Sequence, residues 1–576
     1  MNDSLRQWKQ SMRTKLNILW SSLYIDRATF IPHWRDISDF VCPRRPRYFI
    51  TDVNRGDRRD QHILDSTPTK AWETCAAGMM SSITSPTRPW FGLGVNDPDL
   101  MSKKNIQEYY EECGERMRNV FYQSNLYNVI PEIYEDLTAF GTACAGMEED
   151  FENVVNFRSF PIGSFFLAND EKGRVRVFMR EFEMTVRQLL EKFGERNEKR
   201  EITNWDHFST MVHDFWEKNQ LEAWVQVVHV VFPNDDFDGE KIEAKHKKFR
   251  SIYYERGIAP QHSTDTDDAD YFLSDSGYDF FPILAPRWAK TGEDVYGTRC
   301  PGMTSLGDIR QLQIMEKRIM MAAEKMVNPP LKADPSMRNQ KISMLPGDIT
   351  FVSSREKADS VSPMYQVTFD IKAVQEKQNE TRQRILTNFY ADLFRMMTDS
   401  DRREITAYEV AEKKSEKLLM LGPMVENNNQ DLLTPCINNL FYIMERRSLL
   451  PKMPTELKGK KLHPTYISIM AQASKLANMT SLQQFQQMVT QLVPVVPSIM
   501  DRIDEDKFLE LYGDALGISP KILRDDDATN KIRDEKAKQA QQQAQAQQAQ
   551  QLAAAGKDAS QAQPDSDNLL GKALGA

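Results

Sequence analysis

A short charged stretch at the junction of two helical patterns holds the residues best suited to an ionic contact. It runs from Thr398 to Ile405 as Thr-Asp-Ser-Asp-Arg-Arg-Glu-Ile. Its charged residues are Asp399, Asp401, Arg402, Arg403 and Glu404. If copies of the chain form a ring, each copy would place this stretch at the central hole, where it could act as a moving loop. An ordinary exposed turn has the same composition, and the residues alone leave both interpretations open.

Other groups of reactive side chains lack the spacing of a known site. Six aspartates lie between Arg256 and Phe280, but the ligand order of an EF-hand and its closing glutamate are absent, so we expect a solvated acidic loop. A metal-dependent enzyme that uses these carboxylates is the alternative. His207 and His213 have no third ligand in view, and the sequence contains no phosphate-binding loop, nucleophile elbow or HExxH motif. We therefore predict no enzymatic activity, no cofactor and no metal site.

Two helical patterns must position the charged stretch. Apolar residues recur every three or four positions over residues 371–397, which predicts a helix about 40 Å long. A second pattern over residues 406–447 predicts a helix of about 60 Å if it is continuous. Gly422 and Pro423 predict a kink there because proline lacks the backbone donor, and Pro435 predicts a second disturbance. An antiparallel hairpin inside an ordinary helical domain has the same periodicity.

Composition limits the class of protein. The 576 residues carry a net charge of −9 with a pI near 5.6, which argues against binding nucleic acid along the whole surface. The six cysteines include no CxxC pair, which is typical of free buried thiols in a reducing compartment. We recognise no signal peptide and no apolar run long enough to span a membrane.

The rest of the chain predicts an α+β fold with helical rods. Residues 1–300 form the mixed body, with helical patterns at 1–40 and 102–140. Strands are expected at 153–157, 164–168, 174–183, 223–232, 249–256 and 280–285, with a helix at 186–193. A helical pattern at 304–327 stops at Asn328-Pro-Pro330, and the next forty residues form a small module, with strands at 349–353 and 365–369, at the far end of the long helices.

The C-terminal region is again helical in pattern. Residues 464–493 are rich in Met and Gln at helical spacing, and a last helix follows the Ser519-Pro520 cap. Residues 539–563 are nearly all Gln and Ala. This segment has no apolar stripe, so it should be frayed or disordered alone, or bundled with copies of itself.

Short motifs occur in a characteristic order before about residue 450. They are Asn54-Arg-Gly-Asp-Arg-Arg59, Ile63-Leu-Asp-Ser-Thr67, Ala77-Gly-Met-Met80, Ser85-Pro86, Arg88-Pro-Trp-Phe91, Tyr296-Gly297, Pro301-Gly302, Asn328-Pro-Pro-Leu331, Thr406-Ala407, Glu409-Val410 and Leu421-Gly422-Pro423. Together they resemble the head-to-tail connecting (portal) proteins of short-tailed bacteriophages. After residue 450 the resemblance is one of composition.

The resemblance implies a portal-like subunit that assembles into a ring. Its parts are a wing body (1–300), stem helices (301–327 and 369–397), a clip (328–368), a tunnel loop (398–405), a long kinked wing helix (406–450), a helical crown (451–538) and a Gln/Ala-rich tail (539–576). It implies about twelve subunits at one capsid vertex, through which double-stranded DNA is packaged and ejected. It also implies that the protein is located in the virion, at the portal vertex, after assembly in the host cytoplasm.

The implied partners follow from the same resemblance. They are the terminase large subunit, which must supply the energy, the major capsid and scaffolding proteins, the tail adaptor proteins and the DNA in transit, with no membrane. Arg402 and Arg403 would contact phosphates transiently, while the neighbouring carboxylates limit the dwell time or pair with other subunits. Trp72 and Trp90 are expected in the core. The alternative is a head-tail adaptor or scaffolding protein without a channel.

Overall fold

The computed structural model describes most of the chain as two compact units. The described residues are 12–48, 59–95, 97–101, 103–197, 202–241, 243–257, 272–333, 361–364, 371–398, 421–457, 463–466, 486–489 and 526–561, with a few isolated positions. The first unit comprises Met1–Leu93, Glu112–Met453 and Leu462–Ser474. The second comprises Gly94–Glu111, Pro454–Lys461 and Lys475–Ala576.

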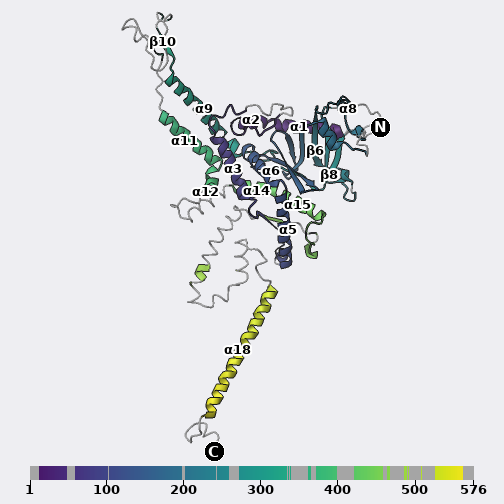
Figure 1. Ribbon diagram of the computed structural model, residues 1–576, viewed down its shortest axis with the longest axis vertical. Helices are drawn as coiled ribbons and strands as arrows, with labels where there is room; N and C mark the ends of the chain where they lie inside the picture. Colours follow the sequence, from purple (N-terminus) through teal and green to yellow (C-terminus); the bar gives the residue numbers. More distant parts are fainter. Residues whose placement is uncertain are drawn as a thin grey trace, which may run out of the picture. The chain divides into compact units, whose positions relative to one another are not determined.

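A five-stranded antiparallel sheet lies in the first unit (Figure 1). Its strands, in spatial order, are β4 (Phe165–Asn169), β5 (Val175–Thr185), β6 (Trp224–Pro233), β7 (Phe249–Glu255) and β8 (Phe272–Tyr278). Each strand pairs with the next one along the chain. The β4–β5 turn closes at Gly173, whose φ of 69° suits a residue without a Cβ. This hairpin joins the strands expected at 164–168 and 174–183.

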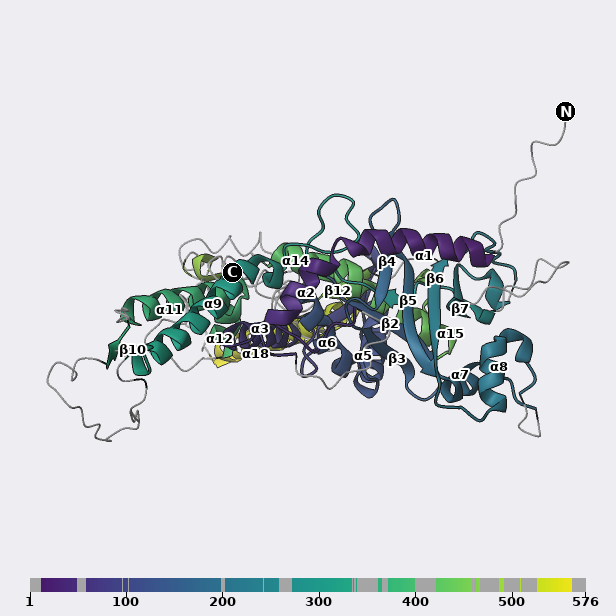
Figure 2. The same ribbon diagram turned by 90° about the horizontal axis from the view of Figure 1, so that it is seen from above.

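Helices cover both faces of this sheet (Figure 2). Helix α1 (Met12–Ala28) packs on one face, and α7 (Val186–Phe193) and α8 (Thr210–Glu217) pack on the other. Strand β6 shows why two apolar layers form: Val225 and Val227 join the cluster with α7 and α8, whereas Val228 and Val230 join the cluster with α1. Successive side chains of a strand point to opposite faces, so the odd-numbered valines lie on one face of the sheet and the even-numbered valines on the other.

A smaller sheet and a layer of helices complete the body of the first unit. The sheet has the order β3 (Val154–Phe160), β2 (Cys144–Asp150), β9 (Ile283–Leu284). The helices are α2 (Ile31–Phe40), α3 (Thr67–Ile83) and α6 (Leu126–Phe140), while α5 (Lys104–Gln123) has residues in both units. Trp72 and Trp90 are buried, as predicted, and all six cysteines are buried too.

The remaining described elements of the first unit are mainly helical. Helices α9 (Pro301–Val327) and α11 (Ile371–Asn388) lie side by side, and a ribbon of β10 (Leu331–Ala333) and β11 (Val361–Pro363) lies at their far end (Figure 1). The later helices are α12 (Ala391–Thr398), α14 (Gly422–Asn428) and α15 (Thr434–Arg446). The ribbon thus lies at the tip of two long helices, where the sequence predicts a small module; the strands expected at 349–353 and 365–369 lie outside the described residues.

The acidic stretch before Phe280 differs from the expectation of a solvated loop. Residues 272–278 form β8, an ordered edge of the large sheet. Asp275 pairs with Arg250 at 2.7 Å, and Asp279 pairs with Lys247 at 2.9 Å. The expectation was wrong for these residues because cross-strand arginine and lysine neutralise the carboxylates; residues 258–271 lie outside the described part.

One further expectation about the C-terminal region was wrong. Residues 463–466 form the strand β12, which pairs with β1 (Phe91–Gly94), where a helix was predicted from residue 464. The Gln/Ala-rich segment is helical as far as Gln561, since α18 (Asp526–Gln561) runs through it. Ala and Gln have high helix propensity, and the bundling of this segment with copies of itself stays a prediction. Among the helices of the described residues, no stretch is long and apolar enough to cross a bilayer.

Candidate functional site

The hairpin of α9 and α11, called the stem hairpin below, presents the candidate functional site. The buried residues of α9 all lie in its first half, from Pro301 to Gln313. Beyond them every residue of α9 is exposed or half-buried. The helix is therefore anchored at one end and projects at the other, and it stops where Asn328-Pro-Pro330 removes two successive backbone donors.

A polar clamp fixes the base of the stem hairpin to the rest of the first unit. The side-chain carbonyl of Gln313 accepts hydrogen bonds from the backbone amides of Leu64 and Asp65, at 2.7 and 2.9 Å. Arg382 of α11 donates to the Asp65 carboxylate at 2.8 Å and to Glu316 of α9 at 2.7 Å. The Ile63-Leu-Asp-Ser-Thr67 motif thus holds both helices, because Asp65 contacts each of them.

The carboxylate of Asp65 is stabilised in its charged form. Burial alone would raise the pKa of Asp65, but hydrogen bonds from Thr67 and Arg382 outweigh burial and lower the pKa below its ordinary value of 3.8. The backbone amide of Thr67 donates to this carboxylate at 2.7 Å, at the start of α3. One carboxylate therefore joins the start of α3 to the stem hairpin.

The second stem helix is broken, which corrects the single helix predicted over residues 371–397. Helix α11 ends at Asn388, and α12 begins at Ala391. Between them Tyr390 has a φ of 55°, a left-handed conformation rare for an aromatic residue. The Thr387 hydroxyl donates to Asp392 at 3.1 Å across this turn. Neither Gly nor Pro marks the break in the sequence, so helical periodicity alone could not reveal it.

Helix α12 carries the chain to the charged stretch and packs closely on α3. A Cβ added at Gly78 of α3 would overlap the ring of Phe394, so only glycine leaves room for that side chain. The same steric reason explains other motif glycines. A Cβ at Gly302 would meet the backbone of Ala139, and one at Gly297 would meet the backbone of Gly141. These motifs therefore mark close backbone packing rather than catalysis.

The predicted tunnel-loop residues lie outside the described part of the chain. Asp399, Asp401, Arg402, Arg403 and Glu404 follow α12 immediately, and their grouping stays a prediction.

The residues of the predicted kink, Gly422 and Pro423, lie at a helix start. Helix α14 begins at Gly422 with Pro423 in its first turn, where the missing amide needs no partner. Residues 406–420 are outside the described part, so the kink itself stays a prediction. The expected disturbance near Pro435 is present as a π-helical turn, Asn429–Leu433. Pro435 lies just after it, in the first turn of α15.

The π-helical turn is tied to the large sheet through one buried arginine. Asp431 in the turn accepts hydrogen bonds from Arg287 and Lys290, each at 3.1 Å. Arg287 is fully buried and also donates to Asn169 and to the carbonyl oxygen of Gly173 in the β4–β5 turn. The helix and the hairpin therefore share one charged contact, which the sequence did not reveal.

The projecting half of the stem hairpin exposes apolar side chains. In α9 the exposed apolar residues are Ile314, Met320, Met321, Met326 and Val327, with Ile314 51% and Val327 87% exposed. At 100° per residue, Ile314 and Met321 share one face, and Met320 and Val327 share a second face about 120° away. Met326 lies alone about 120° from the first face on its other side. The rod therefore has two apolar faces that nothing among the described residues covers.

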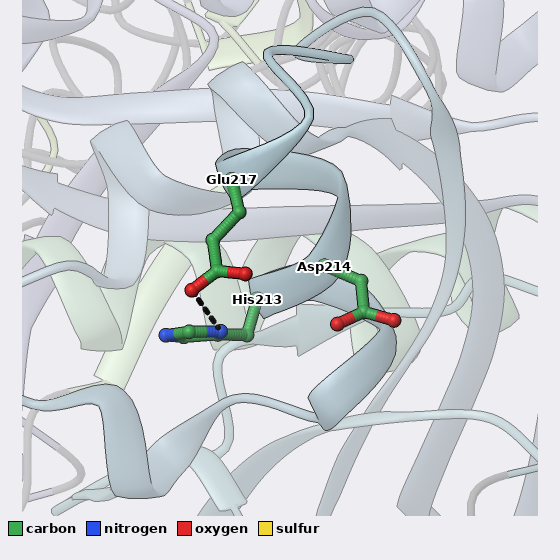
Figure 3. Close-up of side chains that lie close together, drawn as sticks. All are labelled: His213, Asp214 and Glu217. Atoms are coloured by element: carbon green, nitrogen blue, oxygen red, sulfur yellow. Dashed lines mark ion pairs between the residues drawn. The ribbon is translucent and has the colours of Figure 1, made fainter.

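A histidine and two carboxylates on α8 are the described side chains that most resemble a metal site (Figure 3). His213 and Glu217 lie one helical turn apart, with 3.5 Å between Nδ1 and a carboxylate oxygen, and Asp214 points to the side. All three side chains are largely open to solvent. His207 lies on a separate 3₁₀ turn. The geometry is that of a surface i,i+4 ion pair, and it adds no catalytic chemistry.

Comparisons with known proteins agree on one family. A family model described as bacteriophage head to tail connecting protein matches residues 13–523. The chain is 40% identical over 545 residues to the portal protein of Salmonella phage epsilon15, with 95% of each chain covered. It is 35% identical over 529 residues to the probable portal protein of Bordetella phage BPP-1, with 92% of each covered. Such proteins are structural components of the virion, not enzymes. This chain therefore belongs to the head-to-tail connecting, or portal, protein family of bacteriophages.

Proposed function

We propose that this chain forms a closed ring of about twelve subunits at one capsid vertex, through which double-stranded DNA enters and leaves. The two exposed apolar faces of α9 are the observation that carries this proposal. A subunit in a cyclic ring contacts one neighbour with one surface and the other neighbour with a different surface. A rod with two separate apolar faces meets that requirement, whereas an isologous dimer needs a single face.

Electron microscopy of the purified protein, with a mass measurement on the same sample, tests the ring. We expect a closed ring with a hole wide enough for a DNA duplex. The double variant Met320→Asp/Val327→Asp should reduce ring formation, because it places charge in an apolar contact. The matched control Met211→Asp/Phe237→Asp alters exposed apolar residues of the sheet region and should leave the ring intact. A dimer or filament, even with scaffolding and capsid proteins present, would favour the adaptor or scaffolding alternative.

The DNA path is proposed to pass the tunnel loop. Arg402 and Arg403 contact phosphates briefly, and the acidic neighbours of these arginines keep the residence time short, because DNA must slide without being held. The double variant Arg402→Glu/Arg403→Glu should impair packaging or DNA retention. The control Lys218→Glu/Lys241→Glu makes the same charge change on exposed side chains. Unchanged packaging and retention in the tunnel-loop variant would exclude this role.

The clip is proposed to bind the terminase large subunit during filling and the tail adaptor proteins afterwards. The β10–β11 ribbon supports this, since it lies at the tip of the stem hairpin, far from the large sheet. Replacing residues 341–360 with a short Gly/Ser linker should abolish terminase binding while the ring persists. Retained terminase binding by that ring would place the contact elsewhere, for example on the wing that faces capsid and scaffolding proteins.

A further inference from the structure

A cavity of about 590 Å³ beside the large sheet has an excess of positive charge. It lies between the end of α1, the β3–β4 connection, β5 and α7, all in the first unit. Its basic lining residues are Arg27, Arg47, Arg158, Arg180 and Lys192. In a chain with a net charge of −9, five cations around one cavity need an explanation.

Acidic residues of the cavity lining do not offset this charge. Glu181 and Glu183 are the carboxylates of the lining. Glu181 pairs with Arg256 at 2.9 Å, and Arg256 is not a lining residue. Among the described residues neither Arg158 nor Lys192 forms an ion pair within 4.0 Å. The lining therefore holds two carboxylates and five cations, and one of the two carboxylates is already paired with Arg256.

Arg180 is the cation that most needs a partner. It is only 6% exposed, and its guanidinium group lies 4.6 Å from the ring centre of Phe160 and 4.2 Å from that of Phe182. Among the described residues, no acceptor reaches its Nε or Nη2. Burial lowers the pKa of Arg180 and the charge of Arg158 adds to this effect, while Tyr253 and Glu148 oppose it in part. The two rings fix the plane of the guanidinium group while its Nε–H and Nη2–H groups remain available.

A buried guanidinium group without a counter-charge costs free energy that an anion recovers. The planar guanidinium fork matches two oxygens of one oxyanion, and phosphate offers the most acceptors in a compact group. The cavity volume lies in the usual range for small-molecule sites, roughly 300–1,000 Å³. We propose that this cavity binds a small phosphate-bearing anion, with Arg180 as the fixed donor and with Arg158 and Lys192 at the more open side. The proposal does not depend on ring formation or on the DNA path.

Thermal unfolding and calorimetric titration of the full-length protein with inorganic phosphate test the site. Chloride at equal ionic strength is the reference, because it corrects for general screening. We expect phosphate to raise the melting temperature and chloride not to. Arg180→Met should abolish the phosphate response, and its own melting temperature without phosphate should be unchanged or higher, because an uncompensated buried charge is removed.

Two variants at better-exposed positions keep the test decisive if Arg180→Met fails to fold. Arg158→Gln should weaken phosphate binding roughly tenfold, since it removes a charge at the open side. Arg176 lies on β5, the strand of Arg180, and pairs with Asp170 outside the cavity. The Arg176→Gln variant should therefore bind phosphate normally. No stabilisation beyond that by chloride, or an equal loss in Arg158→Gln and Arg176→Gln, overturns the proposal.

A mononucleotide, AMP, distinguishes the two sources of the anion. Binding of AMP at least tenfold tighter than phosphate, lost with Arg180→Met, identifies a nucleotide site in which an aromatic ring stacks on the base. Equal binding of both ligands identifies a site for free phosphate. Either result supports the site, and binding of neither ligand excludes it.

Discussion

The large sheet and the stem hairpin differ in how far they bury their apolar side chains. The sheet buries apolar side chains on both faces, under α1 on one side and under α7 and α8 on the other. The stem hairpin buries them only at its base, and beyond Gln313 helix α9 leaves Ile314, Met320 and Val327 exposed. The large sheet is therefore covered within one subunit, whereas the stem hairpin leaves apolar side chains exposed, which we propose other copies cover.

The sharpest test of this difference uses two neighbouring residues of α9. Leu312 is fully buried, and Ile314 is half exposed. Leu312→Ala should destabilise the monomer by about 2–5 kcal/mol, because it leaves a cavity. Ile314→Ala should change monomer stability by less than about 0.5 kcal/mol but should weaken the ring. Chemical unfolding of the monomer and the mass of the assembly measure the two effects. Equal destabilisation by both variants would show that the rod is packed like the sheet region.

A second test compares two glycines in helices. Gly78→Ala should destabilise the protein by about 1–3 kcal/mol, because the new methyl group displaces the Phe394 ring and overpacks the contact between α3 and α12. Gly307→Ala in α9 meets no atom within 4 Å and should stabilise the monomer by about 0.5–1 kcal/mol, because alanine restricts the unfolded chain.

A double variant tests whether contact with the Phe394 ring causes the destabilisation by Gly78→Ala. Phe394→Leu should recover part of the loss when it is combined with Gly78→Ala, since the smaller side chain makes room for the methyl group. Strictly additive losses in the double variant would contradict a direct contact between these two residues.

The Asp65 clamp between the start of α3 and the stem hairpin should depend on pH. Because hydrogen bonds from Thr67 and Arg382 hold the folded-state pKa of Asp65 below 3.8, the clamp contributes its full stability above pH 3.8. That contribution is lost as the pH falls through the lower folded-state pKa. Melting temperatures of wild type and Asp65→Asn between pH 3 and pH 7 should therefore converge in acid. A constant difference across this range would mean that the charge of Asp65 is not what holds the clamp.

Periodicity predicted the elements that bury one face and missed the places where the chain changes direction. The five strands of the large sheet were foreseen except β8, because Asp275 hides a strand whose charge is paired with Arg250. The break at Tyr390 was missed, since a left-handed aromatic residue has no signature in the sequence. Motif glycines such as Gly78 were noticed as part of a resemblance, but only the packing shows that they make room for a neighbour.

The candidate site was predicted by resemblance rather than by local physics. Nothing in the spacing of residues 398–405 distinguishes a tunnel loop from an ordinary turn, because the function depends on copies of the chain around an axis. The Gln313–Asp65 contact joins residues 248 positions apart, and no short-range pattern contains it. The basic cavity likewise gathers residues from four separate segments, so the excess charge appears only in the folded chain.

The smallest effect is expected for the surface ion pairs of the stem hairpin. Lys377 and Glu380 of α11 lie one turn apart, with 2.7 Å between their charged atoms, and both side chains are about half exposed. Water and salt screen such a pair, and ordering two long side chains offsets the attraction. Lys377→Ala should therefore leave the melting temperature of the monomer unchanged at physiological salt. A clear loss confined to the assembled ring would mean that a neighbouring subunit buries this pair, and it would extend the difference between the sheet region and the stem hairpin from apolar to charged residues.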